Sequence, residues 1–135
     1  MSGENRATRT RVMLVDDHAD FRHLMTALLD REPDLEVVAQ AGSLAEARSH
    51  AAEVRFDVAV LDLGLPDGNG ADLIGDVREV NAGAAVLILS ASLHPTNLKR
   101  VMEAGADQIL DKLASPAEVV GAIRRLGTGE VVDTV

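Results

Sequence analysis

The chain has 135 residues, the length of one ordinary domain, and 47% of them are apolar although only 1% are aromatic. Its formal net charge of −9 repels phosphate backbones and anionic membranes, so we expect neither direct nucleic-acid binding nor membrane binding by this chain. Cys is absent from the sequence, which excludes disulfides and thiolate chemistry. No apolar run reaches the roughly 18 residues of a membrane span, and the first residues are polar and basic, which favours a cytoplasmic protein.

Five short aliphatic runs recur along the chain and predict five β-strands. They are rich in β-branched residues and lack polar alternation, which is typical of strands buried on both faces of a parallel sheet. The runs comprise residues 12–15, 37–39, 58–61, 86–89 and 109–110.

Apolar residues at helical spacing fill the segments between these runs and predict five helices. Met25 and Met102 fall on the apolar stripes and Met13 lies in the first strand run, so we expect all three in the core. The stripes are Phe21, Leu24, Met25, Leu28 and Leu29; Leu44, Ala47, Ala51 and Val54; Leu73, Ile74 and Val77; Leu98, Val101 and Met102; and Val119, Val120, Ile123 and Leu126.

Two helix starts carry their own signals. Ser43 with Glu46, and Ser115 with Glu118, have the spacing of a capping box, and Pro116 stands at a first helical position. Strands that alternate with helices through right-handed crossovers predict a three-layer, doubly wound α/β domain. Its five-stranded parallel sheet is expected in the flavodoxin-like order 2-1-3-4-5. We assign the domain to residues 11–128, a flexible N-terminal tail to 1–10, and a C-terminal tail or the start of a linker to 129–135.

Polar residues interrupt the apolar runs at their carboxyl ends. Asp16 and Asp17 follow the first run, Asp62 the third, Ser90 the fourth and Lys112 the fifth. In the predicted topology these ends meet at one edge of the sheet, beside the switch point where ligands bind. Carboxylates held this close repel one another unless a cation lies among them, so the cluster predicts a hard divalent ion, most simply Mg²⁺.

Such a site suits phosphoryl transfer. Mg²⁺ and a Lys ammonium neutralise phosphate oxygens, a Ser hydroxyl donates to another oxygen, and a carboxylate can act as the nucleophile. From the residues alone we therefore infer a transient acyl phosphate on Asp62.

The same residues lie in four segments that together resemble the receiver domain of two-component response regulators. The resemblance extends over nearly the whole chain and is strongest to receivers of the LuxR/NarL type. The segments are the acidic first strand (12–18), the phosphoacceptor segment (60–68), the switch-hydroxyl segment (89–91) and the last strand with its lysine (105–112).

The resemblance implies a role for each acidic residue. Asp62 would accept the phosphoryl group, and Asp17 and Asp62 would bind Mg²⁺ together with the backbone carbonyl of Gly64. Asp16 would act on the metal through a water molecule or orient it. The phosphoryl donor would be a sensor histidine kinase, and the chain would not be a multiple-turnover enzyme.

The resemblance also implies a switch. Ser90 would move to meet the phosphoryl group, and Lys112 would bridge Asp62 or its phosphate. The output surface would consist of helix 4, strand 5 and helix 5, counted along the chain. Two copies of the chain could form a homodimer through this surface. Ile109 stands where receivers of this type usually carry Tyr or Phe, and Leu113 stands where many carry Pro, so the coupling to output is expected to differ here.

Two other functions stay open at this point. One is a phosphorylation-independent interaction module with the receiver fold, which Ile109 favours. The other is a phosphatase of the haloacid-dehalogenase type, which needs a second Asp two residues after the nucleophile, where this chain has Gly64. The sequence does not decide whether a DNA-binding effector domain belongs to the same protein.

The remaining ionisable residues receive no functional assignment. The four His residues lie on separate elements and only His18 is near the predicted site, so we assign no metal to them. Arg124 and Arg125 are expected on a solvated helix face, or paired with acidic residues across a dimer.

Overall fold

The five predicted strands form one parallel sheet in a computed structural model, which describes residues 9–129. The strand bounds are β1 Thr10–Val15, β2 Leu35–Ala41, β3 Val58–Leu61, β6 Ala85–Ser90 and β7 Gln108–Asp111, and a two-stranded hairpin is formed by β4 Gly64–Leu65 and β5 Gly68–Asn69. The strands of the large sheet pair in the order β2-β1-β3-β6-β7, which confirms the predicted order, because β6 and β7 are its fourth and fifth strands.

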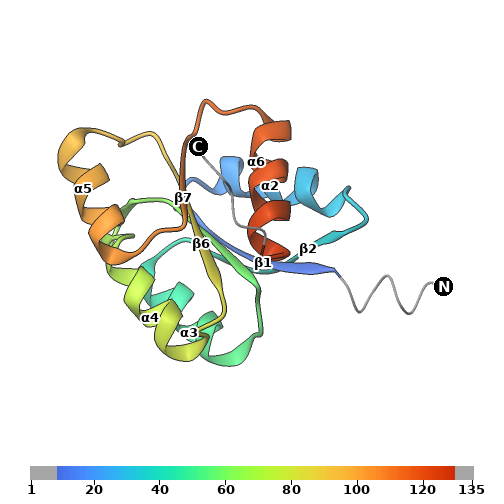
Figure 1. Ribbon diagram of the computed structural model, residues 1–135, viewed down its shortest axis with the longest axis horizontal. Helices are drawn as coiled ribbons and strands as arrows, with labels where there is room; N and C mark the ends of the chain where they lie inside the picture. The colour runs from blue at the N-terminus through green and yellow to red at the C-terminus, as the bar shows by residue number, and fades with distance from the viewer. Residues whose placement is uncertain (1–8, 130–135) are drawn as a thin grey trace.

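Five helices cover the two faces of this sheet, as predicted (Figure 1). The helices α2 and α6 pack on one face, and α3, α4 and α5 pack on the other. The output elements expected from sequence, helix 4, strand 5 and helix 5, correspond to α5, β7 and α6. The helix bounds are α2 Ala19–Asp30, α3 Leu44–Glu53, α4 Asp72–Val80, α5 Pro95–Ala104 and α6 Pro116–Gly127.

The alternation of β-strand side chains divides the core into two clusters. In β1, Val12 and Leu14 face the cluster under α2 and α6, whereas Met13 and Val15 face the cluster under α3, α4 and α5. All four of these side chains are buried. Because both faces of the sheet are covered, its inner strands contain no polar alternation, and they end abruptly where polar residues begin.

Helix caps fix the register of the helices against the strands. Ser115 and Glu118 form a reciprocal capping box, and Ser43 Oγ accepts a hydrogen bond from the Glu46 amide at 3.1 Å. Pro116 stands in the first turn of α6, and Pro95 likewise opens α5. The α5 helix ends at Gly105 with φ = 98°, a left-handed conformation that glycine adopts without strain.

Two side chains that the sequence pattern placed in the core are exposed. Leu24 of α2 is 60% exposed and Met102 of α5 is 68% exposed, so both predictions were wrong. Only Val101 of α5 is buried, because this helix contacts the rest of the domain along a narrow line, and Met102 lies about 100° further round the helix. Met13 and Met25 are buried as expected.

The ends of the domain differ slightly from the predicted boundaries. Thr10 is the first residue of β1 and is buried, whereas the sequence placed it at the end of a tail. Of the predicted tails, 1–10 and 129–135, residues 1–8 and 130–135 lie outside the described residues. None of the helices between residues 9 and 129 has the length and apolar character that crossing a bilayer requires.

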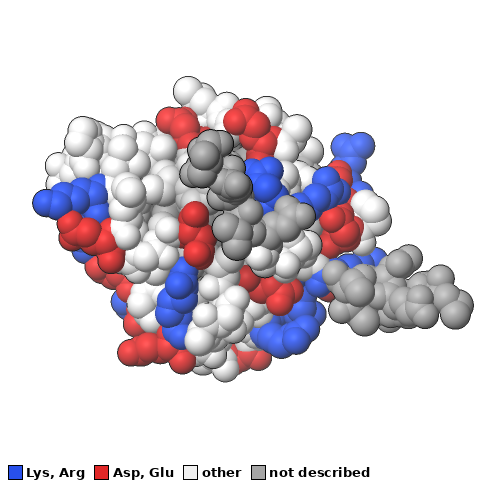
Figure 2. All heavy atoms as spheres, viewed as in Figure 1, with Lys and Arg blue, Asp and Glu red and all other residues white. Residues whose placement is uncertain are grey.

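Charged side chains of both signs are intermixed on the face shown in Figure 2. Several ion pairs join different elements of the domain. Arg48 of α3 and Arg100 of α5 each bind a carboxylate of α4. Arg124 binds Glu32 at 2.6 Å and Asp34 at 2.7 Å within the same chain. Intramolecular partners therefore occupy the guanidinium that the sequence analysis considered for a dimer contact.

Candidate functional site

The predicted site residues meet at the carboxyl edge of the sheet. Asp16 follows β1 and Asp62 follows β3, and these strands are direct neighbours. Asp16 is 2% exposed, Asp62 is 5% exposed, and Ser90 at the end of β6 is fully buried. Buried carboxylates require compensating charge or hydrogen bonds, so Asp16 and Asp62 make this end of the sheet the candidate functional site.

Lys112, which follows β7, supplies the compensating charge. Its Nζ lies 2.8 Å from Asp16 Oδ2 and 3.0 Å from Asp62 Oδ2, so one ammonium bridges both carboxylates. Burial alone would lower the pKa of Lys112, but the hydrogen bonds to the two carboxylates outweigh it and hold this pKa above its ordinary value. The ammonium also lies 4.7 Å from the centre of the Phe21 ring, where a cation is attracted to the aromatic face.

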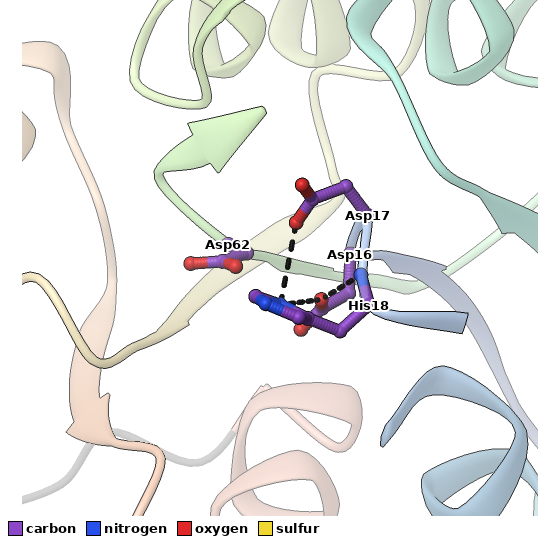
Figure 3. Close-up of side chains that lie close together, drawn as sticks. All are labelled: Asp16, Asp17, His18 and Asp62. Carbon is purple, nitrogen blue, oxygen red and sulfur yellow. Dashed lines mark hydrogen bonds and ion pairs between the residues drawn. The ribbon is translucent and has the colours of Figure 1, made fainter. Parts of the chain in front are cut away.

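Asp17 and His18 complete the cluster on its solvent side (Figure 3). His18 Nδ1 lies 3.4 Å from Asp16 Oδ1 and 3.4 Å from Asp17 Oδ1. One ligand atom from each of Asp16, Asp17, His18 and Asp62 lies within 4.8 Å of the others. His18 therefore belongs to the pocket, although the sequence analysis gave it no role.

Backbone amides fix the two buried carboxylates. The amide of His18 donates to Asp16 Oδ1 at 2.9 Å, and the amide of Leu63 donates to Asp62 Oδ1 at 2.7 Å. Arg22 of α2 donates from Nη1 to the carbonyl oxygen of Asp16 at 2.6 Å. Arg22 could not be predicted from the sequence, because its partner is a backbone atom and leaves no signal in the side-chain pattern.

Gly70 is a further residue whose importance the sequence did not reveal. A Cβ atom at this position would lie 2.0 Å from the carbonyl oxygen of Asp62, a contact that no side chain can make. The Gly70 amide also donates to the carbonyl of Leu63 at 2.9 Å. The chain thus returns directly over the segment that carries Asp62, and only glycine allows this approach.

Ser90 and Ile109, the two predicted switch residues, lie on neighbouring strands. Ser90 Oγ accepts a hydrogen bond from the Ser92 amide at 3.1 Å, and its carbonyl accepts from the Lys112 amide at 3.2 Å. Ile109 is partly buried against the core cluster under α3, α4 and α5. Gly64, the predicted carbonyl donor, is exposed and opens the short strand β4, Gly64–Leu65.

The donor set fits a hard divalent cation. Asp16, Asp17 and Asp62 offer carboxylate oxygens, the ligand type that Mg²⁺ prefers, and one oxygen of each lies within 4.8 Å of the others. Both oxygens of Asp16 and both oxygens of Asp62 have partners within the chain, Lys112 and a backbone amide in each case, whereas Asp17 is exposed. The combination of buried acids, a bridging ammonium and a buried hydroxyl defines a class of protein, a flavodoxin-like domain with an acidic cation-binding pocket.

Comparisons with known proteins narrow this class to a family. Residues 12–124 match the response regulator receiver domain. The chain is 38% identical over 119 residues to the DNA-binding transcriptional activator DevR/DosR of Mycobacterium tuberculosis, covering 88% of this chain and 55% of that protein. It is 36% identical over 126 residues to the nitrate/nitrite response regulator protein NarP of Escherichia coli, covering 93% of this chain and 59% of that protein.

Solved structures of response regulators match the fold of this chain. The chain matches a LuxR-family two-component response regulator from Aurantimonas sp. with a TM-score of 0.82 and 34% identity, covering 90% of this chain and 86% of that one. It matches the signal receiver domain of the putative response regulator NarL from Mycobacterium tuberculosis with a TM-score of 0.79 and 30% identity, covering 90% and 98%.

The chain therefore belongs to the response regulator receiver domain family and is of the LuxR/NarL type. Its function is that of a phosphoacceptor receiver in two-component signalling. The chain spans little more than half the length of the curated relatives reported above.

Proposed function

We propose that Asp62 accepts a phosphoryl group from the phosphohistidine of a sensor histidine kinase. The observation that carries this assignment is the ammonium of Lys112, which lies 3.0 Å from Asp62 and 2.8 Å from Asp16. Of the two buried carboxylates, Asp62 follows the central strand β3, and its other oxygen is held by the amide of Leu63. This arrangement aligns a nucleophile beside a fixed positive charge, which phosphoryl transfer requires.

The phosphorylation step exchanges one covalent bond for another. A carboxylate oxygen of Asp62 attacks phosphorus and forms an O–P bond while the N–P bond of the donor phosphohistidine breaks, and the electron pair of that bond returns to the imidazole nitrogen. Water later hydrolyses the acyl phosphate, which releases phosphate and regenerates the carboxylate. The chain therefore takes part in its own phosphorylation and dephosphorylation, and we propose no multiple-turnover reaction on a separate substrate.

Mg²⁺ would be held by Asp17, Asp62 and the backbone carbonyl of Gly64, with Asp16 orienting it through a water molecule. The carboxylate oxygens that converge here support this ligand set. When bound, Mg²⁺ neutralises charge on the transferred phosphoryl group. Lys112 serves another phosphoryl oxygen, since its ammonium already faces Asp62.

Ser90 would couple the phosphoryl group to the output surface. Its hydroxyl would exchange the present bond from the Ser92 amide for one to a phosphoryl oxygen, which shifts the loop before α5. Ile109 on β7 would repack in response, as an aliphatic substitute for the aromatic residue of related receivers. The surface formed by α5, β7 and α6 would then change its affinity for a partner, including a second copy of this chain.

The cellular setting follows from the donor and the relatives. The proposed donor is a kinase that would draw its phosphoryl group from ATP, which supports a cytoplasmic location for this receiver. DevR/DosR is described as a DNA-binding transcriptional activator, so we assign this receiver to the control of transcription through a DNA-binding effector. The constitutive-module alternative gains no support from the comparisons, and Gly64 two residues after Asp62 gives none to the phosphatase.

Intact-protein mass spectrometry tests the assignment. Wild type incubated with acetyl phosphate and Mg²⁺ should gain one phosphoryl group, roughly 80 Da, and Asp62→Asn should gain none. Asp16→Asn is the matched carboxylate control, because it keeps the Asp62 nucleophile and should still be labelled, although more slowly. Equal labelling of wild type and Asp62→Asn would refute the assignment of the nucleophile.

A further inference from the structure

The chain forms a hairpin directly after the proposed phosphoacceptor. Strand β4, Gly64–Leu65, pairs antiparallel with β5, Gly68–Asn69, so each strand has two residues. A hairpin of this size is not stable by its own hydrogen bonds. Its position relative to Asp62 must therefore be set by contacts with the rest of the domain.

Asp67 at the hairpin turn makes such a contact. Its Oδ1 accepts a hydrogen bond from the Leu44 amide at 2.8 Å, and its Oδ2 accepts one from the Ala45 amide at 3.0 Å. These bonds hold the pKa of Asp67 below its ordinary value, so the carboxylate is charged at neutral pH. One side chain thus ties the hairpin to the start of α3, more than twenty residues earlier in the chain.

The two hydrogen bonds of Asp67 are additional to the N-cap that α3 already has. Ser43 is the N-cap residue and accepts from the Glu46 amide, so the helix has its own capping side chain. Packing supports the same attachment, because Gly68 lies so close to Leu44 that a Cβ atom there would be 2.6 Å from Leu44 Cδ1. The attachment therefore serves the position of the hairpin more than the start of the helix.

We infer that Asp67 is a positioning residue for the cation site, because it holds the hairpin and with it Gly64 in place beside Asp62. This inference rests on the proposed function, in which Gly64 offers its carbonyl to Mg²⁺. Asp67 touches neither the metal nor the phosphoryl group. Loss of its carboxylate removes both hydrogen bonds between the hairpin and α3 and leaves only their packing contact, so the metal must then restrict the hairpin further when it binds.

Isothermal titration calorimetry of the full chain with Mg²⁺ tests this role. Asp67→Ala should raise the Kd for Mg²⁺ about tenfold, the size of effect seen when a residue that supports a metal ligand is removed. Asp67→Asn keeps one acceptor oxygen and should fall between wild type and the Ala variant. Labelling by acetyl phosphate should slow in Asp67→Ala at low Mg²⁺ and recover at saturating Mg²⁺.

Ser43→Ala is the matched control. It removes a cap from the same helix terminus and leaves both bonds of Asp67 intact, so it should lower the melting temperature yet change the Kd by less than about twofold. A wild-type Kd in Asp67→Ala, or an equal rise in Ser43→Ala, would overturn the inference.

The outcomes also separate this inference from the proposed function. If wild type is labelled at Asp62 and Asp67→Ala binds Mg²⁺ as wild type does, the positioning role alone fails. If wild type is not labelled but Asp67→Ala still weakens Mg²⁺ binding, the phosphoacceptor assignment alone fails. A wild-type chain without measurable Mg²⁺ binding would overturn both.

Discussion

Removing the ammonium of Lys112 should lower the free energy of unfolding by an amount that follows from its burial and its two ion pairs. Lys112→Met keeps most of the aliphatic side chain and deletes the ammonium, which lies between the two carboxylates and 4.7 Å from the centre of the Phe21 ring. The side chains of Asp16 and Asp62 are only 3% and 6% exposed, so two buried carboxylates lose their shared cation, at 2.8 and 3.0 Å. Breaking a buried ion pair costs about 3–5 kcal/mol of the free energy of unfolding. Because the Lys112 side chain is 13% exposed and water screens the pair in part, we expect Lys112→Met to cost about 2–4 kcal/mol.

Urea unfolding followed by circular dichroism measures this cost, first with EDTA and then with Mg²⁺. Mg²⁺ should stabilise Lys112→Met more than wild type, because the metal meets two carboxylates that no ammonium neutralises. Lys99→Met is the control, since Lys99 is 81% exposed and lies 3.9 Å from Glu103, so its loss should cost less than about 0.5 kcal/mol. A cost below about 1 kcal/mol for Lys112→Met, or an equal gain from Mg²⁺ in both proteins, would refute the reasoning.

Three further substitutions have defined outcomes. Gly70→Ala places a Cβ atom 2.0 Å from the Asp62 carbonyl oxygen, so we expect a loss of about 2–3 kcal/mol in urea unfolding and slower labelling by acetyl phosphate. Arg124→Ala should cost about 0.5–1 kcal/mol at pH 7, because the ion pairs it breaks are half-exposed. The hydrogen bond from Arg124 holds the pKa of Asp34 below 3.8, so its contribution to the free energy of unfolding is present above pH 3.8. This contribution is lost as the pH falls through the folded-state pKa of Asp34. The free energies of unfolding of wild type and Arg124→Ala should therefore converge in acid. Ser115→Ala should cost about 1 kcal/mol through loss of its cap on α6 and leave labelling intact, as thermal melts and mass spectra would report.

The sheet order and the location of the site were predictable because both follow from local features of the sequence. Strands buried on two faces must be apolar throughout, so Asp16 and Asp62 stand out where the strands end. Parallel strands bring such ends to one edge, and Lys112 at the end of β7 joins them there. The convergence of these side chains therefore needs only the order of the strands, which the alternation of strand and helix already implies.

The supporting contacts were not predictable, because each joins a side chain to backbone atoms, which leave no signal in the residue pattern. Asp67 bonds to amides of α3, and Arg22 bonds to a backbone carbonyl, so neither residue belongs to a motif. Met102 was misplaced for a related reason. Periodicity shows that a helix has an apolar stripe, but the width of the buried face depends on how closely α5 approaches the sheet, and only Val101 is buried there.

The position of Lys112 connects the cation pocket with the output surface. The Lys112 amide donates to the Ser90 carbonyl, so the end of β7 is attached to the end of β6 through the same residue whose ammonium lies between the acidic groups. A metal ion or phosphoryl group that draws the ammonium away from Asp16 alters the balance of forces on this residue. Its backbone lies between β7 and α6, two elements of the proposed output surface, so in the proposed switch a change of charge in the pocket would reach that surface through one residue. Ile109 on the same strand would then need only to repack against its core cluster, which an aliphatic side chain can do without a hydroxyl group.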